Sequence, residues 1–537
     1  MHDSLAIVPQ SNNNRSRSGA TGEFCNLLHM KARLVFIALL LTLASCAGVP
    51  FDYPKTASTA LPPSTDTRMG QVDAAWEQAH GELSGVIGLS DGMDALGARL
   101  KMIELAESTI DAQYFIVKKD RAGALFTGKM LRAADRGIRV RLLVDDIFSP
   151  GVDQAFSLLN SHPNIQVRLF NPLSRQSFKY WSYLVDFKRA NRRMHNKSFT
   201  VDNAMTIVGG RNIGEEYFEL NQNVKFGDYE VFALGPVVDE VSAGFDIFWN
   251  SELSVPMEAF KVKVKPADLD KWREYIKAQV DKGEHGIYGQ AMNSSLLLDI
   301  ESGKRKPIAA MVTMVTDTPE KLQNAIGDAE LATLAREKGR RFRAAQREII
   351  IVTPYFIPQQ SGTKSLEALL AKGIRIVIVT NSLASTNHVA VYSGYRRYRK
   401  RLLRAGAEIY EIRADQAGGE NAWGHSPEMI TLHSKASIID RETIFVGSLN
   451  YDPRSILINS EMGLFIESDY AASTLAAAIF DALGRVTYKV DLDERGKLRW
   501  TYHNGEQHEV LKKSPQASWG RRFMARFYGF LPIENQL

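Results

Sequence analysis

Cysteine is nearly absent from this chain: Cys25 and Cys46 are the only two among its 537 residues. Two thiols cannot form a disulfide scaffold, and they are too few for a cysteine-rich zinc or iron–sulfur centre. A strong net charge is lacking as well, because 66 Lys and Arg residues stand against 61 Asp and Glu residues, a net charge of +5. Any surface that binds an anion must therefore come from local clustering of basic side chains.

A long hydrophobic run is also missing, since the almost unbroken apolar stretch 34–44 falls short of the ~20 residues that cross a bilayer. Basic residues precede this stretch, and small residues close it. Such an order is typical of a secretory signal peptide. The sequence Leu43-Ala44-Ser45-Cys46 resembles the processing box of bacterial lipoproteins, in which the cysteine is acylated. A buried helix with a chance cysteine is the alternative interpretation.

We therefore predict an N-terminal extension and lipoprotein-type signal peptide over residues 1–45, with Met30 as an alternative start to Met1. Residues 46–80 would follow as a tether. Lipid on Cys46 would anchor the mature protein to a membrane of the bacterial cell envelope, facing the periplasm. Removal of the leader would leave no free thiol, which suits an oxidising compartment.

The rest of the chain carries an internal duplication. Residues 110–116 and 137–144 are apolar runs rich in β-branched side chains, and a helical segment separates them. Residues 351–357 and 373–380 repeat this pattern. Near-continuous apolar runs are typical of strands in sheets covered on both faces, and their alternation with helices predicts an α/β fold. We predict two equal lobes, residues 81–255 and 307–485. An insertion, residues 256–306, separates them, and a C-terminal hairpin with a basic aromatic tail, residues 486–537, follows the second lobe.

Each lobe carries a histidine motif with the same spacing. His195, Lys197 and Asp202 recur 238 residues later as His433, Lys435 and Asp440. Glycine-rich pairs and asparagines follow at the same offset, namely Gly210 and Asn212 in the first copy, Ser448 and Asn450 in the second. One such triplet is expected by chance on the order of a few hundredths per chain. Two in register therefore indicate a functional pair.

The spacing has a chemical meaning. Side chains at i and i+2 of a strand share a face, so each histidine projects together with its lysine. Two lysines, two asparagines and backbone amides would hold a tetrahedral anion, while two histidines supply a nucleophile and a proton. We predict Asn212, Asn450, Gly210 and Ser448 as phosphate-binding positions.

These repeats resemble the H-x-K-x4-D motifs of the phospholipase D superfamily, and their surroundings at 191–202 and 447–455 resemble the bacterial cardiolipin synthase C group. The resemblance implies two pseudo-symmetric α/β/α lobes with one active site at their interface. It also implies that one histidine attacks phosphorus to form a phosphohistidine, and that the other protonates the leaving alcohol and deprotonates the incoming one. By this resemblance His195 is the nucleophile and His433 the general acid/base, although the repeat alone leaves the order open.

The same resemblance implies a carboxylate that orients each histidine. Glu461 matches that position in the second lobe, and Asp228 is a looser match in the first. Asp202 and Asp440 belong to the motif and are expected to brace a turn. No metal or other cofactor is implied, so the pair Asp145-Asp146 is expected to be a solvated strand end.

The predicted activity is that of a phosphatidyltransferase of the cardiolipin synthase type, moving a phosphatidyl group between phospholipids. Phosphatidylglycerol is the expected substrate, with phosphatidylethanolamine a further candidate. A phospholipase D that releases phosphatidic acid stays open, because acceptor choice depends on loops. A nuclease or nucleic-acid-binding protein is the alternative from another class, but no nucleic acid is expected, since a small net charge attracts polyanions weakly.

Three surface features accompany the motifs. The basic cluster 188–193 adjoins His195 and is expected to attract anionic headgroups. Aromatic residues within 178–183 are read either as an acyl-chain entrance or as core. Aromatic residues recur at helical spacing within 519–530, which fits either an interfacial membrane helix or, as we favour, docking onto the chain's own lobe. His388 and His425 are expected at the surface.

Overall fold

The computed structural model describes residues 48–147, 151–175, 186–221, 224–324, 328, 330–415, 429–505 and 508–537. The predictions made for the leader, for lipid on Cys46, for the aromatic residues within 178–183 and for His425 lie outside these residues. The chain divides into a smaller unit, residues 1–49 and 174–186, and a larger one, residues 50–173 and 187–537. The description below concerns the larger unit, which contains both histidine motifs.

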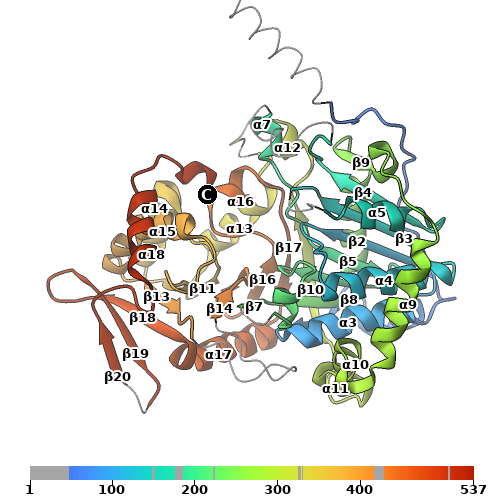
Figure 1. Ribbon diagram of the computed structural model, residues 1–537. Coiled ribbons are helices and arrows are strands. Elements are labelled where there is room, and N and C mark those ends of the chain that lie inside the picture. Colours follow the sequence, from blue (N-terminus) through green and yellow to red (C-terminus); the bar gives the residue numbers. More distant parts are fainter. Residues whose placement is uncertain are drawn as a thin grey trace, which may run out of the picture. The chain divides into compact units, whose positions relative to one another are not determined.

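Lobe 1 is built on a mixed sheet (Figure 1). Three adjacent strands of this sheet, which carry residues 109–114, 139–145 and 165–170, run parallel to one another. The strands in spatial order are β1 (Ser84–Leu89), β8 (Glu230–Leu234), β6 (Met205–Gly209), β5 (Ser198–Val201), β2 (Thr109–Tyr114), β3 (Arg139–Asp145), β4 (Ile165–Phe170) and β9 (Ser254–Pro256).

Lobe 2 repeats this order strand for strand, which confirms the predicted α/β duplication. Its parallel strands are β11, β12 and β13. The strands in spatial order are β10 (Ile308–Thr316), β17 (Met462–Glu467), β16 (Thr443–Gly447), β15 (Ala436–Ile439), β11 (Glu348–Val352), β12 (Arg375–Asn381), β13 (Glu408–Ile412) and β18 (Thr487–Leu492), followed by β19 (Leu498–His503) and β20 (His508–Leu511).

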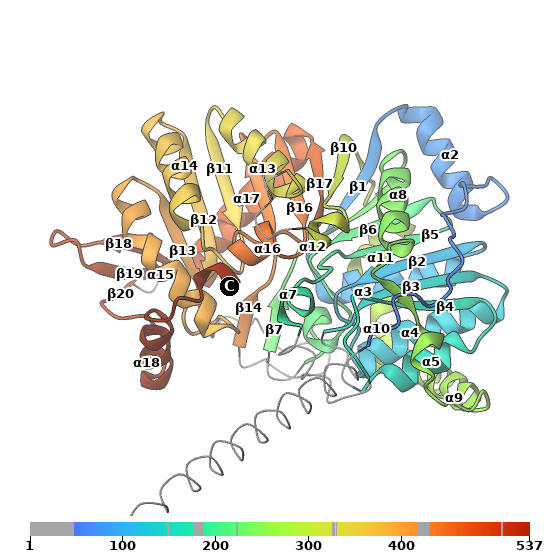
Figure 2. The same ribbon diagram turned by 90° about the horizontal axis from the view of Figure 1, so that it is seen from above.

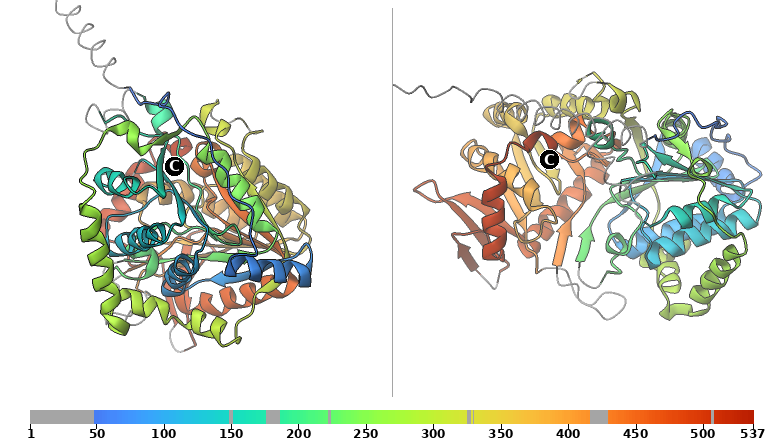
Figure 3. Two further views of the ribbon diagram at one scale, coloured as in Figure 1. Left: turned by 90° about the vertical axis from the view of Figure 1, so that its right-hand side faces the viewer. Right: turned by 45° about the horizontal axis from the view of Figure 1, so that its top comes forward.

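Helices cover both faces of each sheet (Figure 3). On one face lie α3 (Gly92–Leu105), α4 (Arg121–Asp135) and α5 (Asp153–Asn160) in lobe 1, and α13 (Thr333–Ala344), α14 (Gln359–Ala371) and α15 (Val389–Arg404) in lobe 2. On the other face lie α8 (Val237–Trp249) and α17 (Asp469–Val486). Shorter helices are α7 (Phe187–Ala190), α12 (Glu320–Gln323) and α16 (Pro453–Leu457).

The two lobes are joined at two places. Strand β1 pairs antiparallel with β10, from Ser84 against Ala310 to Val86 against Ile308, so that the two sheets form one sheet of 18 strands. A second, two-stranded sheet joins β7 (Val224–Gly227) to β14 (Met429–Leu432) in parallel. Apolar side chains of both lobes share one core cluster beneath α8 and α17. The lobes thus form one continuous body.

The segments outside the lobes pack onto them. In the insertion, α9 (Asp268–Asp281) contacts α4, while α10 (Ile287–Met292) and α11 (Ser295–Glu301) contact α3. The predicted tether contains α2 (Arg68–His80), and Arg168 and Arg141 donate hydrogen bonds to the carbonyls of Thr56 and Ser58. The predicted hairpin turns at Gly496, whose φ is +67°, and its first strand extends the lobe 2 sheet. Among the described residues, no helix is both long and apolar enough to cross a bilayer.

Candidate active site

Each histidine precedes a strand at the centre of its lobe, and a side chain at the end of a strand two places away in the sheet holds the residue before it. In lobe 1, Met194 N donates to Asp145 Oδ2 over 2.9 Å. In lobe 2, Leu432 N donates to Asn381 Oδ1, also over 2.9 Å. Asp145 and Asn381 end the equivalent strands β3 and β12. The two histidines are therefore positioned by the same device.

Asp145 and Asp146 were predicted as a solvated strand end, and this is wrong. Both are fully buried. Asp145 accepts the amide of Met194 and pairs with Arg193 at 3.3 Å, and Asp146 Oδ2 accepts the amide of Leu173 at 2.7 Å. Protein donors replace water around these carboxylates, which is how a buried carboxylate is tolerated. The paired strand ends, Asp145 and Asn381, were the only sequence signal for this role.

The carboxylate beside each histidine comes from the opposite lobe. His195 Nδ1 lies 2.8 Å from Glu461 Oε2, and His433 Nδ1 lies 2.6 Å from Asp228 Oδ2. The backbone repeats this exchange, because His195 N donates to Ser460 O and His433 N donates to Gly227 O. The sequence placed each carboxylate downstream of the histidine in its own lobe, and the exchange between lobes was not foreseen. Since Nδ1 is engaged, Nε2 is the ring nitrogen left for chemistry.

Two further buried side chains hold the backbone of these carboxylate residues. Arg211 Nη2 donates to Asp228 O over 3.0 Å, and Asp317 Oδ2 accepts the amide of Glu461 over 3.1 Å. Arg211 and Asp317 are themselves fully buried. No motif spacing marked either residue, because each acts through contacts made only after the lobes fold.

Gly210, predicted as a phosphate-binding position, lies against a carboxylate. A Cβ atom on Gly210 would come within 2.6 Å of Asp228 Oδ1. A glycine at this position therefore lets Asp228 reach His433. The equivalent Ser448 accepts the amide of Met462 through its hydroxyl over 3.0 Å.

The two predicted phosphate-binding asparagines differ in their surroundings. Asn212 Oδ1 accepts the amide of Ile116, and its Nδ2 donates to the hydroxyl of Tyr217 over 2.9 Å. Asn450 Oδ1 is buried and has no hydrogen-bond partner in the described part of the chain. Asn212 is thus fixed by the protein, whereas Asn450 keeps an unused oxygen.

Both motif lysines are buried beside their histidines. Lys197 Nζ donates to the carbonyl of His195 over 2.6 Å, and Lys435 Nζ donates to the carbonyl of His433 and lies 3.1 Å from both nitrogens of that ring. Lys197 interacts electrostatically with Lys435, and each also interacts with Glu461. The charged groups of both lobes therefore form a single site.

Aromatic rings enclose the histidines. Phe115 meets His195 edge-on with ring centroids 4.9 Å apart, while Phe226 stacks on His433 at 5.3 Å and Tyr217 meets it edge-on at 5.3 Å. Only 8% of the surface of His195 and 7% of that of His433 are exposed. The rings limit solvent access, which strengthens electrostatic interactions within the site.

Burial is the main cause of the pKa shifts in the site. It lowers the pKa of His195 well below the ordinary value, and burial together with Lys435 lowers the pKa of His433 to about 3. Burial lowers the pKa of Lys435 to about 8 and raises that of Glu461 to about 7. For Asp228, burial is outweighed by His433 and Lys435, so its pKa lies below the ordinary value. Both histidines are therefore neutral near pH 7, and Asp228 is ionised.

Asp202 and Asp440 were grouped with the catalytic motif residues and expected to brace a turn. Asp202 follows the end of β5 opposite to His195, and its carboxylate accepts the amides of residues 107–109. Asp440 likewise accepts the amides of residues 346–348. Their φ angles of +53° and +54° place them in the tight turns that join the two hairpin strands.

Comparison with known proteins agrees with this geometry. The family described as "Cardiolipin synthase, PLD-like domain" matches the chain twice, over residues 100–249 and 340–483. The chain belongs to the phospholipase D superfamily, with the cardiolipin synthases. It is 37% identical over 454 residues to cardiolipin synthase C of Escherichia coli K12, covering 84% of this chain and 95% of the relative.

Two further likenesses extend over most of the chain. An uncharacterized protein of Helicobacter pylori 26695 is 32% identical over 466 residues, which cover 84% of this chain and 89% of that protein. The crystal structure of a phosphatidylserine synthase from Haemophilus influenzae Rd KW20 superposes with a TM-score of 0.54 at 14% identity, covering 87% of this chain and all of that one. The latter likeness shows that the two chains share a fold.

The basic cluster 188–193 of this phospholipase D-type chain is divided between surface and interior, since Lys188 is exposed whereas Arg192 and Arg193 are buried. Arg193 pairs with buried Asp145, and Arg192 donates to the carbonyls of Leu322 and Asn324. Both guanidinium groups are buried, so the expectation that they attract headgroups is wrong. On α15, Arg399 is likewise buried against Glu411, and other arginines of that helix pair with glutamates.

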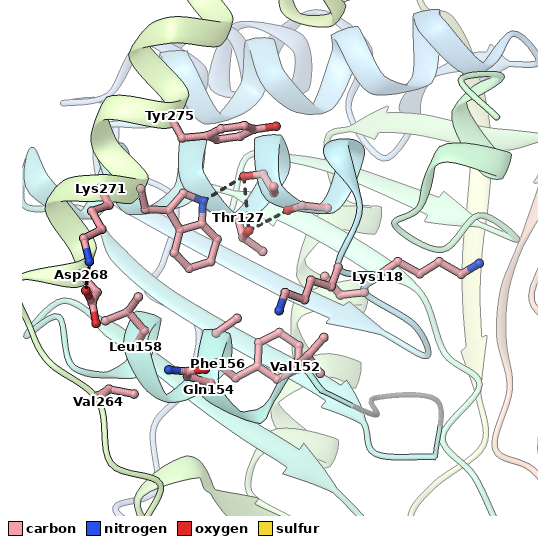
Figure 4. A pocket seen from close by; sticks show the side chains of 16 residues that line it. Lys118, Thr127, Val152, Gln154, Phe156, Leu158, Val264, Asp268, Lys271 and Tyr275 are labelled. Atoms are coloured by element: carbon pink, nitrogen blue, oxygen red, sulfur yellow. Dashed lines mark hydrogen bonds and ion pairs between the residues drawn. The ribbon is translucent and has the colours of Figure 1, made fainter. Parts of the chain in front are cut away.

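A separate pocket of about 430 Å³ lies on lobe 1 between α4, α5 and α9 (Figure 4). Its lining includes Ala124, Phe156, Leu158, Trp272 and Tyr275, and none of the motif residues. It lies apart from the histidine pair of the phospholipase D site. Among the described residues, no group of three or more His, Cys, Asp or Glu side chains is placed to hold a metal ion.

Proposed function

We propose that this protein is a phosphatidyltransferase of the cardiolipin synthase type, which moves a phosphatidyl group between two phospholipids through a phosphohistidine. The observation that carries the proposal is the pair of histidine–carboxylate couples, each formed across the lobes and flanked by a buried lysine. Such a site can bind a phosphodiester, attack its phosphorus and transfer one proton to the leaving group. The likeness to cardiolipin synthase C supports the choice of lipid substrate.

In the first step, Nε2 of neutral His195 attacks phosphorus of the donor lipid. The P–N bond forms as the P–O bond to the leaving glycerol breaks, and His433 donates its proton to that oxygen. Lys197 and Lys435 stabilise the charge on the nonbridging oxygens. Glu461 accepts a hydrogen bond from Nδ1 of His195 and steadies the ring as it becomes cationic.

In the second step, a hydroxyl of the acceptor lipid attacks the phosphohistidine. His433 removes its proton, the new P–O bond forms and the P–N bond breaks, which returns both histidines to their starting state. Water in place of the acceptor would give phosphatidic acid, the product of a phospholipase D. The acceptor alone distinguishes the two reactions.

The two carboxylates support this order of roles. Asp228 is ionised, so it stabilises a protonated His433, as a general acid requires. Burial, Lys197 and Lys435 lower the pKa of His195 and keep it neutral, as a nucleophile requires, while Glu461 accepts a hydrogen bond from its Nδ1. His433 gains its proton when an anionic phosphodiester enters, because the anion offsets the charge of Lys435 that lowers the pKa of His433.

The proposed substrate is phosphatidylglycerol, with phosphatidylethanolamine as a second donor or acceptor candidate. The proposed place is the bacterial cell envelope, with lipid on Cys46 anchoring the protein to a membrane and the site facing the periplasm. We also propose that the chain is divided, as predicted from the sequence, into a leader, a tether, two lobes, an insertion and a tail. Neither a cofactor nor a nucleic acid takes part.

Incubation with labelled phosphatidylglycerol, with and without phosphatidylethanolamine and with added DNA, tests the proposal. Cardiolipin should form with the unaltered protein and disappear in both His195→Ala and His433→Ala. Phosphatidic acid without cardiolipin would establish the hydrolase, and cleaved DNA with unchanged lipid would establish a nuclease. A phosphoenzyme should be absent in His195→Ala and trapped in His433→Ala; the reverse result would exchange the two roles.

A further inference from the structure

Helix α18 (Trp519–Tyr528) and the turn that follows it expose large apolar side chains. Trp519 is 77% exposed, Phe523 53%, Phe527 48% and Phe530 87%. Trp519 and Phe523 stack on each other with ring centroids 5.5 Å apart. Contiguous exposed aromatic surface is unfavourable in water and marks an interaction site. We call these four residues the aromatic face.

The helix is nevertheless firmly docked by its opposite side. Ala525 is 1% exposed and its carbonyl accepts a hydrogen bond from Arg396 of α15. Arg521 donates to the carbonyls of Leu383 and Thr386 over 2.9 and 2.5 Å. Residues four apart share one side of a helix, so Trp519, Phe523 and Phe527 point away from this contact. The predicted docking onto the lobe and an exposed apolar stripe therefore coexist.

The docking contact leads to the active-site edge of lobe 2. Leu383 and Thr386 belong to the loop that follows β12, and Asn381 at the end of β12 holds the amide of Leu432, next to His433. Helix α18 packs beside α15, as Figure 2 shows. Helix α18, which carries the aromatic face, thus contacts the loop after β12, and the last residue of β12 positions the segment of a catalytic histidine.

The segment of chain that carries the aromatic face contains charged residues of positive sign only. No Asp or Glu occurs from Val510 to Ile533, whereas Lys512, Lys513, Arg522 and Arg526 do. Arg526 is exposed beside the stripe, and its long side chain can extend to a polar surface while the rings point elsewhere. Trp and Phe flanked by Arg and Lys is the composition of helices that lie in a membrane interface.

We propose that the aromatic face is a membrane-docking surface that inserts into the interface of a bilayer containing anionic lipid. The rings would enter the boundary between headgroups and acyl chains, and the basic residues would meet lipid phosphates. This contact is separate from lipid on Cys46 and does not depend on the transfer chemistry. It would bring the catalytic edge of lobe 2 to the membrane surface.

Fluorescence of Trp519 tests the proposal on the full-length protein reconstituted with vesicles of phosphatidylcholine and brominated phosphatidylglycerol. The Trp519 signal is the difference between the unaltered protein and Trp519→Phe. It should fall by about half or more, because a ring ~5–10 Å into the interface lies close to brominated acyl carbons. The quenching should vanish in Phe523→Ser/Phe527→Ser, although any lipid anchor remains. Tyr470→Ser, which changes a 70% exposed aromatic residue on α17, should retain it.

An unquenched Trp519, or quenching that survives the double substitution, would overturn the proposal. A second copy of the chain is the competing occupant of the face. A dimer in sedimentation of the detergent-solubilised protein that dissociates in Phe523→Ser/Phe527→Ser, with unquenched Trp519, would assign the face to self-association. The readout needs no cardiolipin formation, so failure of the proposed activity and failure of docking are distinguished.

Discussion

Among single residues, Gly210 has the most direct link to chemistry, because it leaves room for the carboxylate that touches His433. Gly210→Ala should displace Asp228 by the clash at 2.6 Å and lower kcat about 10- to 100-fold, because the carboxylate would no longer orient the ring of His433. Steady-state kinetics with phosphatidylglycerol measure this. Gly227→Ala is the matched control, since a Cβ there finds its nearest atom 3.8 Å away and the carbonyl used by His433 is retained. Equal rates in both variants would contradict the steric argument.

Lys435 makes the activity sensitive to alkaline pH. Burial lowers its pKa to about 8, so the ammonium loses its proton above that pH and no longer stabilises the charged transition state. We expect kcat/KM, which reports the free enzyme, to fall above about pH 8. Lys435→Arg should be slower but should move the fall to higher pH, because a guanidinium stays protonated. An unmoved alkaline limb in Lys435→Arg would assign the titration to another group.

Residue spacing predicted both histidine motifs, because spacing along one strand determines which side chains share a face, whereas the two carboxylates were predicted only from the resemblance to the superfamily. Neither predicted which histidine each carboxylate touches, since that depends on contact between lobes. The burial of Asp145, Arg192 and Arg193 was missed for a related reason: charge in a sequence does not reveal a partner distant along the chain.

At the scale of elements, the ends of β3 and β12 hold the two histidine segments with different side chains. Asp145 accepts an amide and also neutralises Arg193, whereas Asn381 accepts an amide and donates its own Nδ2–H to the carbonyl of Leu432 over 2.9 Å. The parallel strands and their helices were predictable from apolar runs. The short strands β7 and β14 were not, because four residues carry no usable period.

This difference gives a stability prediction. Asp145→Asn keeps an amide acceptor for Met194 but leaves the buried Arg193 guanidinium uncompensated, so the free energy of unfolding should fall by about 3–5 kcal/mol. Denaturant unfolding measures the loss. The double variant Asp145→Asn/Arg193→Met removes the unpaired charge and should recover part of the lost free energy of unfolding. A double variant as unstable as the sum of its single variants would show that the ion pair is not the cause.

At the scale of the whole molecule, the exchange of carboxylates makes the lobes interdependent. Glu461→Gln in lobe 2 should alter the protonation of His195 in lobe 1, and Asp228→Asn in lobe 1 should alter that of His433. Nitrogen NMR of the two imidazoles distinguishes this from effects within a lobe. A response of His433 but not His195 to Glu461→Gln would contradict the crossed arrangement. Each variant should also lower kcat about 10- to 100-fold.

The crossed couples also bear on how a duplicated chain can change over generations. Once the histidine of one half relies on a carboxylate of the other, neither half can be deleted or drift alone without disabling its twin. A harmful change at Glu461 would be compensated by changes around His195, more than 260 positions earlier in the chain. Duplication usually allows one copy to diverge, but here the two copies depend on each other and can change only together.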